Sequence, residues 1–403
     1  MPSLLVDKRI ILGVTGSIAA YKVADWVRAL RRDGASVTVI MTGSATRFVA
    51  PLTFAALSAN RVFTDMFDPV AAETIPHISL AKDCDLLLIA PASAGTIARL
   101  AQGQADDLLA TVALATEAPV LLCPAMNSAM FLHPATQANL ATLRGYGYRV
   151  VEPTAGAMAC GDNGPGRLPE WETVRHAVFS TFAPQDLTGC AVLVTAGPTW
   201  EPLDPVRFLS NRSSGKMGYA IAAAARQRGA TVTLVTGPTD LAAPADVETI
   251  RVTTAQEMHD AVLSRSDAMD VVVKAAAVSD FRPADQACHK LKKADAAATL
   301  PLLANPDILL ALGQRRADGA PPLLVGFAAE SRDHIAEGRR KLHAKNLDLM
   351  VVNDITGADC GFAVDTNRVT LLDNNDTVEE LPLLSKEETA HRIWSRVAKL
   401  LNG

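Results

Sequence analysis

The fold is decided by the stretch Arg9-Ile-Ile-Leu-Gly-Val-Thr-Gly-Ser-Ile-Ala-Ala-Tyr-Lys22. Its apolar start ends in a glycine turn, and residues 18–32 then place apolar side chains at helical spacing until Asp33-Gly34 stops the pattern. A second apolar run, residues 36–41, follows at once. A short buried strand, a helix and another strand in this order predict a parallel α/β unit.

The same order of elements returns in the second half of the chain. Ala191-Val-Leu-Val-Thr-Ala-Gly197 is followed by a helical pattern over 218–228 and a strand pattern over 231–236. Five further runs have the length and composition of strands: 85–90, 120–123, 271–274, 323–327 and 349–353. Residues 182–189 have turn composition and follow a helical stretch. We therefore predict an α/β fold of two three-layer parallel-sheet domains, residues 1–188 flavodoxin- or Rossmann-like and residues 189–403 Rossmann-like.

The composition is that of a globular protein and excludes several function classes. Of 403 residues, 49% are hydrophobic and 20% are charged, and a net charge of -5 gives no basic excess for nucleic-acid binding. No apolar run reaches the roughly 18 residues of a membrane-spanning helix. Residues 1–9 lack a signal-peptide pattern, which predicts a cytoplasmic protein. The six cysteines are dispersed without a C-x-x-C pair, which predicts neither a disulfide framework nor a structural zinc site.

Two turns of small residues in the first half suit a phosphate or a flat ring. Gly16 and Ser17 lie where a strand passes into a helix, so free backbone N–H groups and the helix dipole can hold an anion there. The motif is not G-x-G-x-x-G, and a tight turn without a ligand is the alternative interpretation. Ser93 lies in a second such turn, after residues 85–90. Two turns in one sheet predict a mononucleotide such as FMN at a switch point.

Three other residues of the first half are candidates for chemistry, each with a structural alternative. His77 follows a proline at a turn, where a hydrogen-bonded, partly buried ring is the alternative. Asn127 follows residues 120–123 and can bind a carboxylate or amide, or cap a helix. Cys160 begins a glycine-dense segment ending at Arg167, which is either a lid over a substrate or a surface turn.

Four motifs in this half, taken in order, resemble the family of FMN-dependent cysteine decarboxylases: Gly-Ser-Ile-Ala-Ala-Tyr-Lys, Pro-His-Ile-x-Leu, Pro-Ala-Met-Asn and Ala-Cys-Gly-x-x-Gly-x-Gly-Arg. The resemblance covers most of residues 8–180, with a departure at Gly95. It implies that Asn127 holds the substrate carboxylate, that His77 acts during oxidation and decarboxylation, and that Cys160 donates the last proton. The residues implied to hold FMN are Gly16, Ser17, Ile18, Thr42 and Ser93.

The second half carries its own polar segments. Residues 195–218 place glycines, hydroxyls and cations before a helix, which suits phosphates although Walker spacing is absent. Lys290 opens the cluster Lys290-Leu-Lys-Lys293, which is either a solvated face or a phosphate contact. Lys341 and Lys345 lie at i, i+4 on one helix face, where their repulsion is easiest to explain if an anion lies between them.

These segments resemble the phosphopantothenate-cysteine ligase domain, and the two domains in this order resemble the bifunctional bacterial phosphopantothenoylcysteine decarboxylase/phosphopantothenate-cysteine ligases of coenzyme A biosynthesis. Departures lie at Trp200 and His289. The resemblance implies that residues 189–403 condense 4'-phosphopantothenate with cysteine through an acyl-cytidylate, using CTP and Mg²⁺. Residues 1–188 would then decarboxylate 4'-phosphopantothenoylcysteine to 4'-phosphopantetheine with FMN.

The same resemblance implies roles for residues of the ligase. Asn211 would contact the acyl intermediate, Lys290 would neutralise charge on the phosphates, and Arg207 would support its loop at a dimer interface. The nucleotide and its phosphates would lie against Asp280, Lys290, Pro306, Asp307, Ile308, Leu309, Phe327, Lys341 and Lys345, and the metal ligands are unknown. Trimeric decarboxylase units joined through dimeric ligase units would give a homo-oligomer, a dodecamer, without a nucleic-acid or membrane partner.

Two other functions fit parts of the sequence. A binding or regulatory protein can arise from this family by loss of catalytic residues, but His77, Asn127 and Cys160 are all present. An NAD(P)-linked oxidoreductase would need a dinucleotide fingerprint, and G-x-G-x-x-G is absent from the first glycine turn. The residues alone do not distinguish CTP from ATP.

Overall fold

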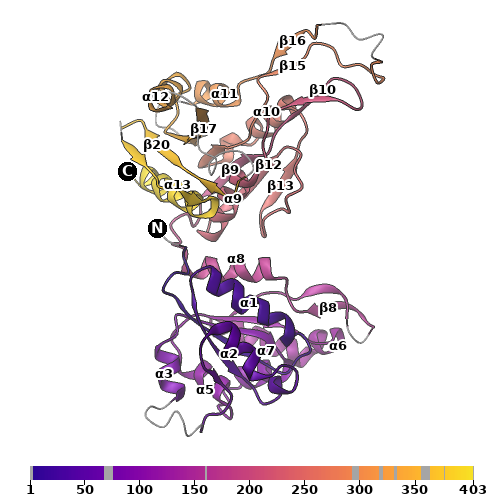
Figure 1. The fold of residues 1–403 in the computed structure, drawn as a ribbon, viewed down its shortest axis with the longest axis vertical. Helices are drawn as coiled ribbons and strands as arrows, with labels where there is room; N and C mark the ends of the chain where they lie inside the picture. The colour runs from indigo at the N-terminus through magenta and orange to yellow at the C-terminus, as the bar shows by residue number, and fades with distance from the viewer. Residues whose placement is uncertain are drawn as a thin grey trace. The chain divides into compact units, whose positions relative to one another are not determined.

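The computed structural model describes residues 3–67, 76–158, 161–292, 299–316, 321–330, 334–354, 364–375 and 377–402. The chain divides into two compact units, Met1–Ala183 and Pro184–Gly403 (Figure 1). Both units are α/β, as the order of elements in the sequence predicts. The domain limits 1–188 and 189–403 remain a prediction.

The first unit is built on a six-stranded parallel sheet in the order β3-β2-β1-β4-β5-β6. The strands are β1 (Arg9–Val14), β2 (Ser36–Met41), β3 (Val62–Phe63), β4 (Leu86–Ala92), β5 (Val120–Pro124) and β6 (Arg149–Val150). This is the Rossmann order, and the direction of strand addition reverses between β1 and β4. Ligands of such sheets bind outside the carboxyl ends of the strands at that point.

Helices cover both faces of this sheet. One face packs on α1 (Ala20–Arg32), α2 (Pro51–Ser58) and α8 (Trp171–Phe182), and the other on α4 (Ala94–Ala101), α5 (Leu108–Ala115) and α7 (Pro134–Gly145). The remaining elements are η1 (Ala45–Arg47), α3 (Pro76–Lys82), α6 (Ser128–Leu132) and the hairpin β7 (Thr154–Ala157) with β8 (Asn163–Arg167). Strand β4 is buried along its whole length, as expected for the centre of a three-layer domain.

The second unit has an eight-stranded sheet in the order β13-β12-β9-β14-β17-β18-β20-β21. The first six strands are parallel: β9 (Ala191–Ala196), β12 (Thr231–Thr236), β13 (Glu248–Arg251), β14 (Val271–Lys274), β17 (Leu323–Glu330) and β18 (Leu349–Asp354). The strands β20 (Val369–Asp373) and β21 (Val378–Glu380) continue the sheet antiparallel. Five of these six parallel strands were predicted from the sequence, whereas β13 and the antiparallel edge were not.

Helices also cover both faces of the second sheet. The helices α9 (Lys216–Gln227) and α13 (Lys386–Leu401) pack on one face, and α10 (Ala255–Leu263), α11 (Ile308–Arg315) and α12 (His334–Ala344) on the other. Smaller elements are β10 (Trp200–Pro202) with β11 (Phe208–Ser210), β15 (Phe281–Pro283) with β16 (Leu302–Ala304), β19 (Thr366–Asn367) with β22 (Leu384–Ser385), and η3 (Ser266–Ala268). Among the described residues no helix combines the length and the apolar character needed to cross a bilayer.

Side-chain caps fix where several helices begin, and two of these caps lie at carboxyl ends of strands. Ser93 Oγ accepts a hydrogen bond from Thr96 N (3.3 Å) directly after β4. Asn127 Oδ1 accepts one from Ala129 N (2.8 Å) shortly after β5. Capping satisfies backbone N–H groups that have no partner inside the helix. The polar side chains that cap α4 and α6 are thereby brought to the same edge of the sheet.

Candidate functional site

A buried threonine joins the two turns at the switch point of the first sheet. Thr15 Oγ1 donates to the carbonyl of Pro91 (2.6 Å) and accepts from Ser93 N (2.9 Å). Its side chain is completely buried. The hydroxyl therefore connects the carboxyl ends of β1 and β4 and sets the spacing of the two small-residue turns.

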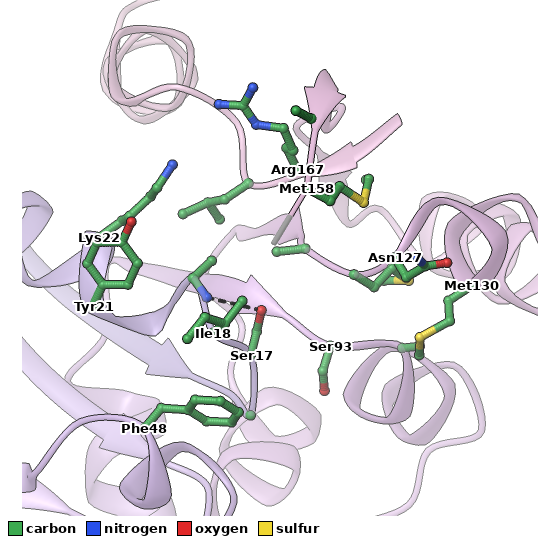
Figure 2. A pocket seen from close by; sticks show the side chains of 18 residues that line it. Ser17, Ile18, Tyr21, Lys22, Phe48, Ser93, Asn127, Met130, Met158 and Arg167 are labelled. Carbon is green, nitrogen blue, oxygen red and sulfur yellow. Dashed lines mark hydrogen bonds between the residues drawn. The ribbon is translucent and has the colours of Figure 1, made fainter. Parts of the chain in front are cut away.

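A cavity of about 650 Å³ opens at these turns (Figure 2). The predicted residues Gly16, Ser17, Ile18, Ser93 and Asn127 all line it. The other lining residues are Ala19, Tyr21, Lys22, Phe48, Ala94, Ala125, Met126, Met130, Ala157, Met158, Gly166, Arg167 and Leu168. The cavity is largely apolar with a few polar groups and two cations, which suits an anionic ligand with a flat ring.

The first turn is built for close approach. A Cβ atom on Gly16 would lie 2.5 Å from the Cβ of Ser44, so only glycine fits the chain there without a shift. Ser17 Oγ accepts a weak hydrogen bond from Ala19 N (3.3 Å), just before helix α1 (Figure 2). The N-terminus of α1 and the ammonium of Lys22 lie at the same cavity, and both favour an anion.

The opposite wall is formed by Asn127 and the β7–β8 hairpin. Asn127 caps α6 through Oδ1 and donates from Nδ2 to Asp162 Oδ2 (2.7 Å). The hairpin is fixed to this corner because Met126 N donates to the carbonyl of Gly166 (2.9 Å). A Cβ atom on Gly166, whose φ is +128°, would lie 2.4 Å from the Met126 carbonyl oxygen. Asn127 therefore caps a helix and also lines the cavity, and its predicted binding of a carboxylate or amide remains a prediction.

Two of the predicted residues of this half, His77 and Thr42, do not line the cavity, and the structure does not describe a third, Cys160. His77 lies in the first turn of α3 and does not line it, and its buried Nδ1 has no hydrogen-bond partner within the described residues. Thr42 follows β2, and its Oγ1 accepts from Ala45 N (3.3 Å) rather than facing the cavity. Cys160 lies outside the described residues. The roles of all three remain predictions.

A second cavity, of about 280 Å³, lies in the other unit at the carboxyl ends of β14, β17 and β18. The predicted residues Asn211, Phe327 and Lys341 line it. Lys216, one of the cations in the segment 195–218 that was predicted to suit phosphates, lines it too. Four further polar residues line it without a predicted role: Lys274, Lys386, Asn353 and Asn367. The helix α9 begins at this cavity, and its Gly218 packs so closely on β9 that an added Cβ would lie 2.5 Å from that of Ala196.

The second cavity is electropositive. Four lysines line it, and burial together with the charges of Lys345 and Lys341 lowers the pKa of Lys274 to about 8. Burial and the charge of Lys216 also lower the pKa of Lys386. Lys216 pairs with Asp365 (2.6 Å). Like charges gathered in a partly buried space are destabilising unless an anion joins them, so this cavity suits a polyanionic ligand.

Two amide oxygens add to this polarity. Asn353 Oδ1 and Asn367 Oδ1 are buried and have no hydrogen-bond donor among the described residues. Asn367 as a whole is only 3% exposed. Buried polar atoms without a partner are costly, and at a cavity they are sites where a ligand donor can bind.

The other residues predicted to contact a nucleotide in the second half, Asp280, Pro306, Asp307, Ile308, Leu309 and Lys345, do not line the cavity. Lys345 pairs with Asp307 (2.7 Å), and this carboxylate is an anion within the chain that offsets the repulsion from Lys341. Asp307 also caps α11, and the side chains of Ile308 and Leu309 are buried in the core. A nucleotide near Pro306 to Leu309 would therefore meet chiefly the backbone at the start of α11. Asp280 is exposed, and its carbonyl accepts from Asn305 N (2.9 Å).

Arg207 holds the segment that contains Lys290. Its guanidinium pairs with Asp204 (2.6 Å) and donates to the carbonyl of Leu291 (2.8 Å), while Leu291 N donates to Asp204 (3.2 Å). The Arg207 guanidinium holds the pKa of Asp204 well below its usual range. Lys290 itself does not line the cavity. In the described part of the chain, no three His, Cys, Asp or Glu side chains gather as a metal site.

The overlooked residues share a signal in the sequence. Lys274 and Asn353 are polar residues that end or nearly end apolar, buried strands. Lys386 occupies the first position of a helix. A polar side chain at the carboxyl end of a central parallel strand lies where ligands bind, and this could have identified Lys274 and Asn353.

Comparison with known proteins matches both units. Residues 2–183 match the family model described as flavoprotein, and residues 187–401 match the DNA/pantothenate metabolism flavoprotein C-terminal domain. The chain is 45% identical over 399 residues to the coenzyme A biosynthesis bifunctional protein CoaBC of Vibrio vulnificus, covering 98% of this chain and 99% of that protein. The protein of the same name from Bacillus subtilis is 46% identical over 403 residues, with 98% of each chain covered.

The CoaBC protein of Mycobacterium tuberculosis is 46% identical over 416 residues, covering 99% of this chain and 98% of that protein. These similarities extend over both units and therefore over both cavities. The chain belongs to the family of coenzyme A biosynthesis bifunctional proteins, enzymes that have decarboxylase and ligase activities.

Proposed function

We propose that the first unit decarboxylates 4'-phosphopantothenoylcysteine with FMN, and that the second forms this substrate from 4'-phosphopantothenate and cysteine with CTP. The observation that carries the proposal is the convergence of Gly16, Ser17, Ser93 and Asn127 on one cavity at the Rossmann switch point. The flavoprotein family match supports a flavin in that cavity. The lysines of the second cavity support a polyphosphate there.

The residues at the first cavity fit FMN. The turn from Gly16 to Ile18 and the start of α1 would hold its phosphate, since glycine permits close approach and backbone N–H groups point outward at a helix N-terminus. Ser93 would contact it from the second turn. When bound, FMN supplies the capacity to take electrons from the cysteine CH₂–SH group and to return them after CO₂ has left.

Residues of the chain would orient the substrate and would protonate the product. Asn127 would donate to the substrate carboxylate, and its capping bond to Ala129 fixes the direction of the amide. Cys160 would protonate the product, and it lies two residues before Asp162, which contacts Asn127. Thr15 would position both turns without touching the substrate.

The trimeric arrangement of this unit is part of the proposal. Ile18, Tyr21, Phe48 and Met130 line the cavity and are each at least half exposed, which leaves an apolar rim on a single copy. His77 does not line this cavity. A second copy placed over the rim would cover the apolar side chains and could supply His77. We further propose that dimeric ligase units join such trimers into a dodecamer in the cytoplasm.

The ligase reaction needs activation, because a carboxylate is a poor electrophile for the amine of cysteine. The carboxylate of 4'-phosphopantothenate would attack the α-phosphate of CTP, and pyrophosphate would leave. The amine of cysteine would then attack the acyl carbon of the acyl-cytidylate, the amide bond would form and CMP would leave. Lys274 and Lys341 would bind the phosphates at the cavity, and Lys290 would neutralise the charge that develops on them. Mg²⁺ would arrive with the triphosphate.

Other ligase residues would contact the organic part of the substrates. Asn211 donates from Nδ2 to the carbonyl of Val278 (2.9 Å), which fixes its side chain at the end of β14, where it would contact the acyl intermediate. Phe327 lines the cavity and would lie against the nucleoside together with Asp280. The choice of CTP over ATP is part of the proposal.

The absorbance spectrum of the purified protein tests the decarboxylase half. We expect a bound flavin that is bleached by 4'-phosphopantothenoylcysteine under anaerobic conditions and recovers as CO₂ and product form. Exchange of Gly16 for valine should abolish flavin binding, because its side chain would collide with Ser44. A protein that binds no flavin and reduces NAD(P) instead would contradict the proposal, because it would be an oxidoreductase of another class.

A further inference from the structure

The hydrogen bond between Asn127 and Asp162 places a carboxylate of the chain where a substrate carboxylate would bind. Asp162 Oδ2 accepts from Asn127 Nδ2 at 2.7 Å, a short distance typical of a charge-assisted hydrogen bond. The other end of the amide is used by the cap of α6, so Nδ2 is the end of Asn127 with which an incoming carboxylate can pair. Figure 2 shows Asn127 at the wall of the cavity.

We propose that Asp162 is an internal substitute for the substrate carboxylate and sets the preference of the site between substrate and product. This inference rests on the proposed function of Asn127. The Asn127 Nδ2 group has two N–H donors, but two carboxylates at the same nitrogen repel each other through their like charges. A carboxylated ligand therefore competes with Asp162 for Asn127, whereas the decarboxylated product leaves the Asn127–Asp162 bond in place.

The surrounding contacts show how the exchange can occur without disturbing the wall. The β7–β8 hairpin is fixed to the α6 corner by the Met126–Gly166 backbone bond (2.9 Å) and by the contact of Ser128 Oγ with Met158 Sδ (3.8 Å). These contacts do not involve the Asp162 side chain, which is exposed. A carboxylated ligand can therefore compete with Asp162 at Asn127 while these hairpin contacts persist.

As a consequence, the site binds the carboxylated substrate more weakly, relative to the decarboxylated product, than it would without the Asp162 carboxylate. In the wild-type protein, the affinity for a carboxylated ligand is reduced by the strength of the Asn127–Asp162 bond. Removal of the Asp162 carboxylate should tighten binding of a carboxylated ligand by roughly three- to tenfold, the range for one partly exposed hydrogen bond. Binding of a ligand without a carboxylate should stay the same.

The test uses the full-length flavin-bound protein and two unreactive ligands that differ only in the carboxylate. These are the serine amide and the ethanolamine amide of 4'-phosphopantothenate, in which a hydroxyl replaces the thiol, and their dissociation constants are measured by calorimetry. Asp162→Ala and Asp162→Asn remove the charge, and Asp162→Asn keeps the size and an acceptor oxygen. Glu152→Ala removes an exposed carboxylate that pairs with Arg144 and does not line the cavity, so it is the matched control.

We expect both Asp162 variants to bind the serine amide more tightly and the ethanolamine amide as before, with Glu152→Ala unchanged for both. Equal weakening of both ligands would mean that Asp162 merely holds the hairpin, and an unchanged ratio of the two affinities would likewise overturn the proposal. Failure of the wild-type protein to decarboxylate would contradict the proposed function and not this inference alone.

Discussion

Replacement of Lys274 by methionine should stabilise the ligase unit and weaken its binding of CTP. Methionine has a similar length and carries no charge. Lys274 ends the buried strand β14, and burial with the neighbouring charges of Lys345 and Lys341 lowers its pKa from 10.5 to about 8. The ammonium is therefore a local source of instability that persists only because the cavity is used for an anion.

The size of the effect follows from the pKa. A fall from 10.5 to about 8 corresponds to about 3 kcal/mol at most, and solvent at this half-buried side chain reduces the expectation to about 1–2 kcal/mol. Below pH 8 the ammonium is charged in both states and the full cost is present. Between about pH 8 and 10.5 the unfolded chain binds more protons than the folded chain, so wild-type stability rises with pH and approaches that of the variant.

The assay is hydrogen exchange of peptides from β9 and β14 in increasing urea, which reports the ligase unit separately from the flavoprotein unit. At pH 7 we expect Lys274→Met to be more stable than wild type, with the difference shrinking toward about pH 10. Calorimetry should show CTP binding weakened by roughly 10- to 100-fold, the range for loss of one charged hydrogen bond.

Lys216→Met is the matched control, because Lys216 lines the same cavity but pairs with Asp365. It should also weaken CTP binding without raising the stability of the unit. A Lys274→Met protein that is less stable than wild type at pH 7, or that binds CTP normally, would refute the reasoning.

Three further outcomes follow from the proposed roles. A fragment of residues 189–403 should condense 4'-phosphopantothenate with cysteine in the presence of CTP and without flavin; a folded but inert fragment would count against the domain limits or the assignment. Lys290→Gln should lower ligase turnover by a factor on the order of 10²–10³ and spare decarboxylation, measured by pyrophosphate and CO₂ release. An unchanged rate would favour the alternative interpretation, in which the lysine cluster is a solvated face. Cys160→Ser should still bleach the flavin and release CO₂ but accumulate an oxidised enethiol product by mass spectrometry, whereas His77→Asn should block before CO₂ appears; a normal product rate in Cys160→Ser would exclude that thiol from the mechanism.

Local patterns were sufficient to predict the layers of both units and the first cavity. In a strand-to-helix turn such as Gly16-Ser17, the groups that can bind a ligand lie within a few residues of one another in the sequence. The strand order then brings Ser93 to the same cavity. The role of Thr15 could not be predicted, because it depends on a hydrogen bond to the carbonyl of Pro91, 76 residues away in the sequence, which no local pattern indicates.

The second site was harder to predict because it is assembled from distant segments. Lys216, Lys274 and Lys386 come from two helix starts and one strand end, and only the parallel stacking of the sheet gathers them. The lysine spacing at 341 and 345 suggested a bound anion, yet the partner of Lys345 is Asp307 on another helix. The antiparallel strands β20 and β21 were missed although β20 is longer than the predicted strand β14, because they do not continue the strand–helix–strand order from which the parallel strands were predicted.

The most direct test of the account is to supply the purified protein with 4'-phosphopantothenate, cysteine and CTP and to follow the products by mass spectrometry. If both cavities work in turn, we expect 4'-phosphopantetheine, CO₂, CMP and pyrophosphate as products, with 4'-phosphopantothenoylcysteine as the intermediate. Omission of CTP should stop all product formation, and added 4'-phosphopantothenoylcysteine should restore 4'-phosphopantetheine without CTP. A flavin-containing, folded protein that yields neither the condensed intermediate nor 4'-phosphopantetheine would contradict the account.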